Sequence, residues 1–185
     1  RTHDTSGQCD SYIYLLKWYL ISRRTLSKEK ELGTTETLYA ELKLDLGQLA
    51  DQLFSPSKVF LQKHGNFLPH GAALIEQGEV RLIAAFPHPQ ARSGSTQMLP
   101  LLYEGLRQQS RQLSLRAIAV AENVTVVQEG KSRTQAIKIL LEHRRGLCVA
   151  LYLPFKKRFL NGYSFGQPFS VAARSEVVAW PHGDA

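Results

Sequence analysis

Two histidines have the type and position that acid–base chemistry needs. His70 and His143 lie in stretches with strand period, and each falls on the apolar side of its expected strand. An imidazole there could act as a base with a displaced pKa, although a core-edge histidine bonded to a backbone carbonyl is the commoner case. Glu142 and His143 point to opposite faces, as strand neighbours do. We therefore take His70 and His143 as a candidate polar site, without an acid–base pair between Glu142 and His143.

Basic residues gather in two clusters, and aromatic rings flank the second. The clusters are Arg144 and Arg145, and then Lys156, Lys157 and Arg158 between Phe155 and Phe159. Rings between cations suit single-stranded nucleic acid, because bases stack on the rings while the cations follow the phosphates. The two clusters fall near opposite ends of one expected strand, which argues against one compact phosphate track. All seven residues are candidate binding residues.

Ser164 lies in a segment that matches a hydrolase signature. Residues 162–166 have the form GxSxG, but a nucleophile elbow needs a strand before the serine and a helix after it. Here Gln167 and Pro168 follow, and the only aspartate after residue 51 is Asp184. We therefore expect a turn between the last two strands and not a catalytic serine.

Neither the histidines nor the cysteines are spaced as metal ligands. The six histidines lack helix or hairpin spacing for a metal ion, and Cys9 and Cys148 form no CxxC pair. No glycine-rich phosphate loop is present. We expect no metal, no cofactor and no disulfide scaffold, as is typical of a reduced cytoplasmic protein.

Composition describes an ordinary globular protein with a basic second segment. The 185 residues are 43% hydrophobic, and no window approaches the ~18 uninterrupted apolar residues that a membrane span needs. Residues 65–180 hold 14 Lys or Arg against 7 Asp or Glu, whereas residues 1–64 hold 9 against 8. A basic segment favours an acidic partner, because net charge acts on association. Since the chain begins with Arg1 and not Met, we expect its natural start to be missing or processed.

The first part of the chain indicates helices and a linker. Residues 10–23 have apolar side chains at helical spacing, and residues 24–36 are charged and polar, which indicates a linker. The stretch 38–53 fits a strand or a helix, and we favour a helix because Ala, Leu, Glu, Lys and Gln dominate it. Pro56 then resembles the first residue of a second short helix, capped by the serine before it. Residues 1–64 are thus expected to be an N-terminal helical and linker segment.

Two hairpins with three-residue loops are expected in the second part of the chain. Their loops are residues 76–78 and 144–146, and the second loop places Gly146 at a left-handed position. The expected pairs are Leu74 with Val80, Ala72 with Leu82 and Leu68 with Phe86 in the first hairpin, and Leu141 with Val149, Ile139 with Leu151 and Ile137 with Leu153 in the second.

One helix and two further strands complete the expected fold. The helix follows Ser95 and has an apolar face that includes Leu102 and Leu106. A long strand over 117–127 comes next, and the last strand covers 169–178. We predict an α+β domain over residues 65–185, with an antiparallel sheet in the order β-β-α-β-β-β and helix on one of its faces.

Three stretches resemble a bacterial family of α+β proteins to which no activity is assigned. They read FLPHGAAL followed by GEV (67–74 and 78–80), LEHRRG (141–146) and LPF (153–155). The resemblance covers residues 65–170 and implies no catalytic residue. Some small bacterial proteins of this kind are thought to be immunity or inhibitor proteins, so by analogy the resemblance implies a binding role.

These observations favour a non-enzymatic binding protein over an enzyme. We expect an acidic protein partner that meets one sheet face or the basic loops, and an immunity-type inhibitor is one version of this function. We expect no membrane contact. Two alternatives stay open: a nucleic-acid-binding protein that uses the basic loops, and an enzyme whose site is not visible in the sequence.

Overall fold

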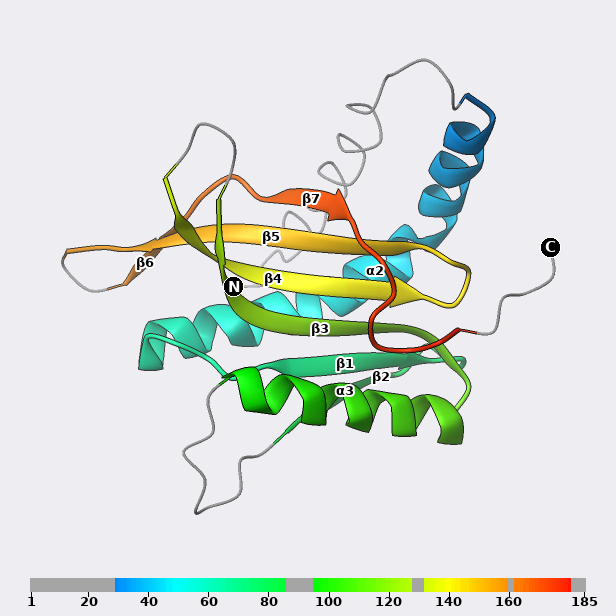
Figure 1. Cartoon of the computed structure of the whole chain (residues 1–185), viewed down its shortest axis with the longest axis horizontal. Coiled ribbons are helices and arrows are strands. Elements are labelled where there is room, and N and C mark those ends of the chain that lie inside the picture. Colours follow the sequence, from blue (N-terminus) through cyan, green and yellow to red (C-terminus); the bar gives the residue numbers. More distant parts are fainter. Residues whose placement is uncertain (1–28, 86–94, 128–131, 160–161, 181–185) are drawn as a thin grey trace, which may run out of the picture.

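The computed structural model describes residues 29–85, 95–127, 132–159 and 162–180. Within them the chain forms two helices and seven strands (Figure 1). The elements are α2 (Glu29–His64), β1 (His70–Ile75), β2 (Val80–Ala84), α3 (Ser95–Gln112), β3 (Leu115–Val126), β4 (Thr134–His143), β5 (Cys148–Lys157), β6 (Tyr163–Phe165) and β7 (Phe169–Ala172). The helix predicted over 10–23 lies outside the described residues.

The seven strands form one antiparallel sheet, which confirms the α+β class. The strand order is β2-β1-β3-β4-β5-β6, and β7 pairs with β5 as well. The predicted order of elements was wrong in two respects. It had three strands after the helix, whereas the structure has five (β3 to β7), and it extended the last strand to Val178, whereas β7 ends at Ala172.

Both hairpins have the predicted register. In the first hairpin, Leu74 pairs with Val80 and Ala72 pairs with Leu82, as predicted. All three predicted pairs of the second hairpin are present. Gly146 has a φ of 84° and the equivalent loop glycine, Gly78, has a φ of 86°, so both loops use a conformation that glycine adopts without steric cost. The pair with Phe86 lies outside the described residues.

α2 covers the first face of the sheet with a continuous apolar stripe. Leu46, Leu49 and Leu53 on α2 are fully buried, and they share one hydrophobic core with Ile137 and Ile139 of β4. The boundary that we expected after residue 64 therefore does not separate two cores. α2 and the sheet are stabilised by the same buried surface.

Pro56 does not divide α2 into the two helices that we expected. A proline inside a helix removes one backbone hydrogen bond, and the hydroxyl of Ser57 donates to the carbonyl of Leu53 at 2.7 Å. Packing of the apolar stripe on both sides of Pro56 outweighs this local cost. α2 also begins at Glu29, so the end of the expected linker is helical instead.

α3 and a C-terminal segment cover the second face. Leu102 and Leu106 of α3 pack in one cluster with Ile118 of β3 and with Val177 and Val178. We call residues 173–180, which follow β7, the strap. Helix was expected on one face only, whereas α2 and α3 lie on opposite faces of the sheet (Figure 1).

Candidate functional site

His143 ends β4 and joins that strand to α2. Its buried imidazole accepts the backbone N–H of Arg145 at Nδ1 (3.1 Å), and its Nε2 lies 3.4 Å from Oδ2 of Asp45. Asp45 also accepts two hydrogen bonds from Arg116, the one from Nε at 2.9 Å. Burial lowers the pKa of His143, and Asp45 only partly offsets this effect. His143 is therefore neutral at neutral pH, with Nε2–H donating to Asp45 and no ring nitrogen free to accept a proton.

His70 begins β1, and protein groups engage both of its ring nitrogens. Nδ1 lies 3.0 Å from the carbonyl oxygen of Leu68, and Nε2 lies 3.2 Å from Oγ of Ser57. The rings of Phe60 and Phe67 pack edge-on against the imidazole. Because Ser57 is fully buried, the Ser57–His70 pair cannot present a hydroxyl to a substrate.

The fold does not bring the two histidines together. His70 pairs with Ala121 of β3 and His143 pairs with Ala117, on the opposite side of that strand. Four positions along a strand correspond to about 13 Å. The candidate polar site is therefore two separate contacts, each of which joins α2 to the sheet.

Acidic partners neutralise Arg144 and Arg145 in the β4–β5 loop. Nη2 of Arg144 lies 3.1 Å from Oε1 of Glu76 in the β1–β2 loop, and Nη1 of Arg145 lies 2.5 Å from Oε2 of Glu41 on α2. Exposed pairs of this kind stabilise a fold by about 1 kcal/mol at most. These two pairs neutralise the arginines, so the first basic cluster offers little net charge to a partner.

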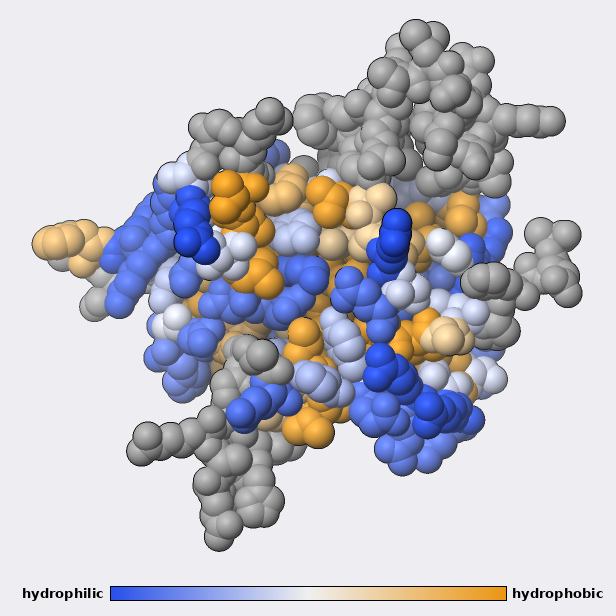
Figure 2. Space-filling model, in the orientation of Figure 1, coloured by the Kyte–Doolittle hydropathy of each residue, from blue (hydrophilic) through white to orange (hydrophobic). Residues whose placement is uncertain are grey.

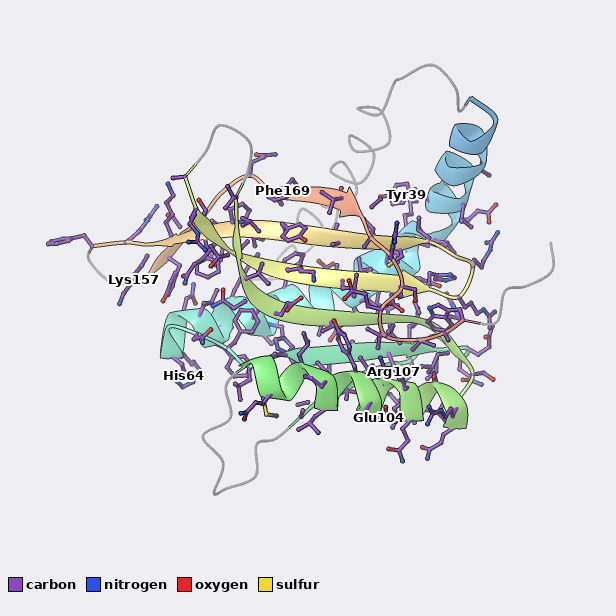
Figure 3. The ribbon with its side chains drawn as sticks, viewed as in Figure 1. Tyr39, His64, Glu104, Arg107, Lys157 and Phe169 are labelled. Carbon is purple, nitrogen blue, oxygen red and sulfur yellow. The ribbon has the colours of Figure 1, made fainter. Side chains whose placement is uncertain are left out.

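The second basic cluster lies at the projecting end of the β5–β6 hairpin (Figure 1). We call Lys156, Lys157, Arg158 and Phe159 the basic tip. All four side chains are exposed, and Phe159 is 102% exposed. No described residue forms an ion pair with any of the three cations. Hydrophilic side chains cover this end of the molecule in Figure 2, with an apolar group at its extremity, and Figure 3 marks Lys157 there.

Phe155 belongs to the core, so its expected role as a surface binding residue was wrong. It is 2% exposed, and its ring packs 5.5 Å from the ring of Tyr163 and 6.4 Å from that of Phe165. Strand alternation explains the difference, because Phe155 points towards α2 while Lys156 points to the other face. The hydroxyl of Tyr163 donates to the carbonyl of Gly65 at 3.3 Å, which fixes the base of the tip to the end of α2.

Ser164 lies in β6, where we expected a turn. It pairs with Lys156 of β5, and its Oγ lies 3.4 Å from the Lys156 carbonyl. The next described element is β7 and not a helix, so the strand–turn–helix context of a nucleophile elbow is missing around Ser164. Its hydroxyl donates to the backbone as an ordinary strand residue does.

The buried carboxylate of Glu142 binds the strap, which we did not predict. Glu142 is 1% exposed. Its Oε1 accepts the backbone N–H groups of Glu176 (2.6 Å) and Val177 (2.9 Å). Its Oε2 accepts the N–H of Val178 (3.2 Å) and the hydroxyl of Ser175 (2.7 Å). In the observed register Ala172 pairs with Val149 near the start of β5, and the N–H groups of residues 176–178 bond to Glu142 and not to a strand.

Arg107 of α3 completes the attachment of the strap from the other side. Its Nε donates to the carbonyl of Val177 at 2.8 Å and its Nη2 to the carbonyl of Glu176 at 3.2 Å, and Figure 3 shows Arg107 beside the strap. One signal in the sequence could have revealed this site. The predicted register places Glu142 on the same face as Leu140, and a carboxylate on an apolar face needs several donors.

A cleft of about 1550 Å³ lies between α2, the β4–β5 loop and the strap. Its lining includes Glu41, Arg145, Arg107 and Cys148. The first two pair with each other and the third binds the strap. Burial raises the pKa of Cys148 to about 12, so its thiol is not activated. These groups already stabilise the fold, and we therefore place the candidate site at the basic tip.

Comparison with known proteins adds no family. The chain matches no protein-family model, no curated protein and no solved structure, so the resemblance over residues 65–170 stays a prediction. No helix among the described residues is long and apolar enough to cross a membrane. The same residues contain no group of His, Cys, Asp and Glu side chains placed to bind a metal ion.

Proposed function

We propose that this protein is a non-enzymatic binding protein whose basic tip engages an acidic surface of a protein partner. One contrast carries the proposal. Arg144 and Arg145 are each paired with a glutamate, whereas the cations of the basic tip have no acidic partner in the part of the chain that the structure describes. Cations without partners beside a fully exposed ring are what a binding surface offers.

A protein partner fits the tip better than single-stranded nucleic acid does. Nucleic-acid surfaces stack successive bases on several rings, but Phe155 is in the core and the hydroxyl of Tyr163 is bonded to Gly65. Phe159 is then the only fully exposed ring of the tip. A single ring that enters a pocket, with charges around it, is the usual arrangement at a protein interface.

The two histidines support binding over catalysis. In both His70 and His143, protein groups engage the two ring nitrogens, so that neither imidazole is available as a general base. An inhibitor or immunity-type protein acts by covering its target and needs no such group. The proposal of a binding role is consistent with this arrangement.

A capture experiment with matched variants tests the proposal. The immobilised protein is expected to retain a protein from nuclease-treated lysate of its source cells, and Phe159→Ser is expected to lose it. Replacing Lys156 and Lys157 by Ala is expected to slow association more than it weakens affinity, because charges at an interface rim act mainly on the association rate. Lys43→Ala removes an exposed cation of α2 and serves as the control.

Nucleic-acid binding is the second candidate, because three adjacent cations without partners would also follow a phosphate backbone. Capture that disappears after nuclease treatment would favour this candidate. Equal capture by wild type and Phe159→Ser would exclude the basic tip as the binding surface for either class of partner.

A further inference from the structure

β2 is an open edge of the sheet. It ends the strand order β2-β1-β3-β4-β5-β6 and is five residues long, Val80–Ala84. The outer side of an edge strand carries unpaired N–H and C=O groups, which proteins usually protect with charges, proline or a bulge. Which residues of β2 face outwards, and what they carry, therefore decides what can bind there.

The hydrogen bonds of the hairpin identify the outward residues. The N–H of Ile75 donates to the carbonyl of Glu79 at 3.0 Å, so these two residues occupy a hydrogen-bonded position. Hydrogen-bonded and non-hydrogen-bonded pairs alternate along an antiparallel ladder, so Arg81 and Ile83 bond to β1. The residues whose backbone groups point away from β1 are Val80, Leu82 and Ala84. No described residue bonds to these outward groups.

The outward positions are apolar and symmetrical about Leu82. Leu82 is 61% exposed, and its side chain lies on the α2 face because its partner Ala72 belongs to the core beneath α2. The charged residue of β2 is Arg81, and it is not at an outward position. Its backbone groups bond to β1, and its Nε lies 3.3 Å from Oε1 of Glu79. β2 thus lacks the charged protection of a typical edge.

Exposed apolar side chains lie on both sides of this edge. On the α3 face, Gly105 is next to Ile83 of β2, and Leu101, one helical turn earlier on the same side, is 59% exposed. On the α2 face, the ring of Phe60 is 43% exposed and lies 6.3 Å from that of His70, the register partner of Ala84. A strand added at β2 would cover apolar surface above and below the sheet.

We propose that two copies of this chain associate through β2, antiparallel, so that their sheets continue into each other. Leu82 pairs with Leu82 of the partner subunit, and Val80 pairs with Ala84 of the partner subunit. A second copy fits because a two-fold axis at Leu82 matches every outward donor with an acceptor and sets the apolar side chains of Val80, Leu82 and Ala84 against those of the other copy. This interface does not involve the basic tip.

The salt response separates this interface from binding at the basic tip. Each copy carries a net charge of +7, so repulsion between copies opposes association and salt screens it. Dimerisation through the apolar edge is therefore expected to strengthen with salt, whereas binding of an acidic partner at the tip is expected to weaken.

Sedimentation velocity across a wide concentration range tests the proposal. The whole chain is expected to dimerise, and Leu82→Lys is expected to weaken the dimer by roughly a hundredfold or more, because it places two like charges together. Leu82→Pro is expected to act similarly, since the N–H that it removes faces the partner and not β1. Leu44→Lys changes a leucine of α2 that is 72% exposed and is the control.

Hydrogen exchange locates the interface. In the wild-type dimer the amides of Val80, Leu82 and Ala84 are expected to be protected, and in Leu82→Lys at the same concentration they are expected to exchange, with unchanged circular dichroism. A wild-type monomer would overturn the proposal, and protected edge amides in that monomer would show that another segment of this chain covers β2. A dimer that Leu82→Lys and Leu82→Pro leave intact, or that Leu44→Lys also disrupts, would overturn it as well.

Discussion

The carboxylate of Glu142 accepts a hydrogen bond from the backbone N–H of Val177 at 2.9 Å, across 35 positions of the chain. This contact and its neighbours hold the strap over the second face of the sheet without a strand ladder. The strap covers part of the cluster that contains Ile118 and Leu140. Glu142, together with Arg107, therefore keeps this apolar surface covered.

Removal of the Glu142 carboxylate is expected to destabilise the protein strongly. Glu142→Ala should lower the free energy of unfolding by about 3 kcal/mol, because several strap N–H groups lose their acceptor and each costs roughly 1–3 kcal/mol if it stays buried. Glu142→Gln should cost about half as much, because one acceptor oxygen is retained. Urea unfolding measures both values, and Trp180 fluorescence in a Trp18→Phe background reports on the strap.

The control for Glu142 is an exposed acidic residue. Glu79→Gln removes a partner of Arg81 at the surface and is expected to change stability by less than ~1 kcal/mol. If Glu142→Ala were no more destabilising than Glu79→Gln, the hydrogen bonds of Glu142 to the strap would not contribute to stability.

Acid is expected to destabilise the protein in two steps. Burial lowers the pKa of His143 below the ordinary 6.5. Below that pH the unfolded chain binds a proton that the folded chain does not, and stability falls as the pH drops towards the folded pKa. Burial alone would raise the pKa of Asp45, but Arg116 and His143 hold it below 3.8. The contribution of Asp45 is therefore present above pH 3.8 and is lost as the pH falls through its folded pKa.

Urea unfolding between neutral pH and pH about 5 checks the first step. Wild type should lose stability over this interval, and His143→Gln should lose less, although its stability at neutral pH is lower. His64→Gln replaces an exposed histidine and should keep the wild-type slope. A slope that His143→Gln leaves unchanged would assign the pH dependence to other groups.

Two glycine substitutions are expected to change stability in opposite directions. Gly146 has a φ of 84°, and an added Cβ would meet nothing within 4 Å, so Gly146→Val should cost about 1–2 kcal/mol through backbone strain alone. Gly105 lies in α3, where an added Cβ would lie 3.9 Å from Ile83. Gly105→Ala should stabilise by about 0.4–1 kcal/mol. Thermal unfolding of both variants tests these values, and wild-type stability of Gly146→Val would contradict the strain argument.

Nucleic-acid probes should bind the basic tip only weakly. We expect no binding of generic RNA or single-stranded DNA tighter than ~1 μM at about 0.15 M salt, because only Phe159 offers an exposed ring at the tip. Fluorescence anisotropy measures this. Tight binding whose logarithmic salt slope is reduced by about 1 in Lys156→Ala and again in Lys157→Ala would show phosphate contacts and favour the nucleic-acid alternative.

Local patterns were enough to predict the hairpins and α3. The alternation around Arg144–Gly146 and the need for a positive φ at Gly146 allow only one register that keeps a continuous apolar face, and that register is observed. The apolar face of α3 with Leu102 and Leu106 was equally visible in the sequence, because helical spacing is a property of neighbouring residues. Each of these predictions depends on a few consecutive residues.

Only the tertiary structure shows which of the candidate residues remain available to bind a partner. Asp45 and His143 are 98 positions apart, and Glu41 and Arg145 are 104 apart. No local pattern shows that such residues meet, because their contact depends on how α2 crosses the sheet. The same packing makes α2 continuous through Pro56. By itself the sequence determined a basic α+β chain with these turns, whereas long-range packing determined which charges are neutralised in pairs and which remain at the basic tip, since pairing requires that separate elements dock.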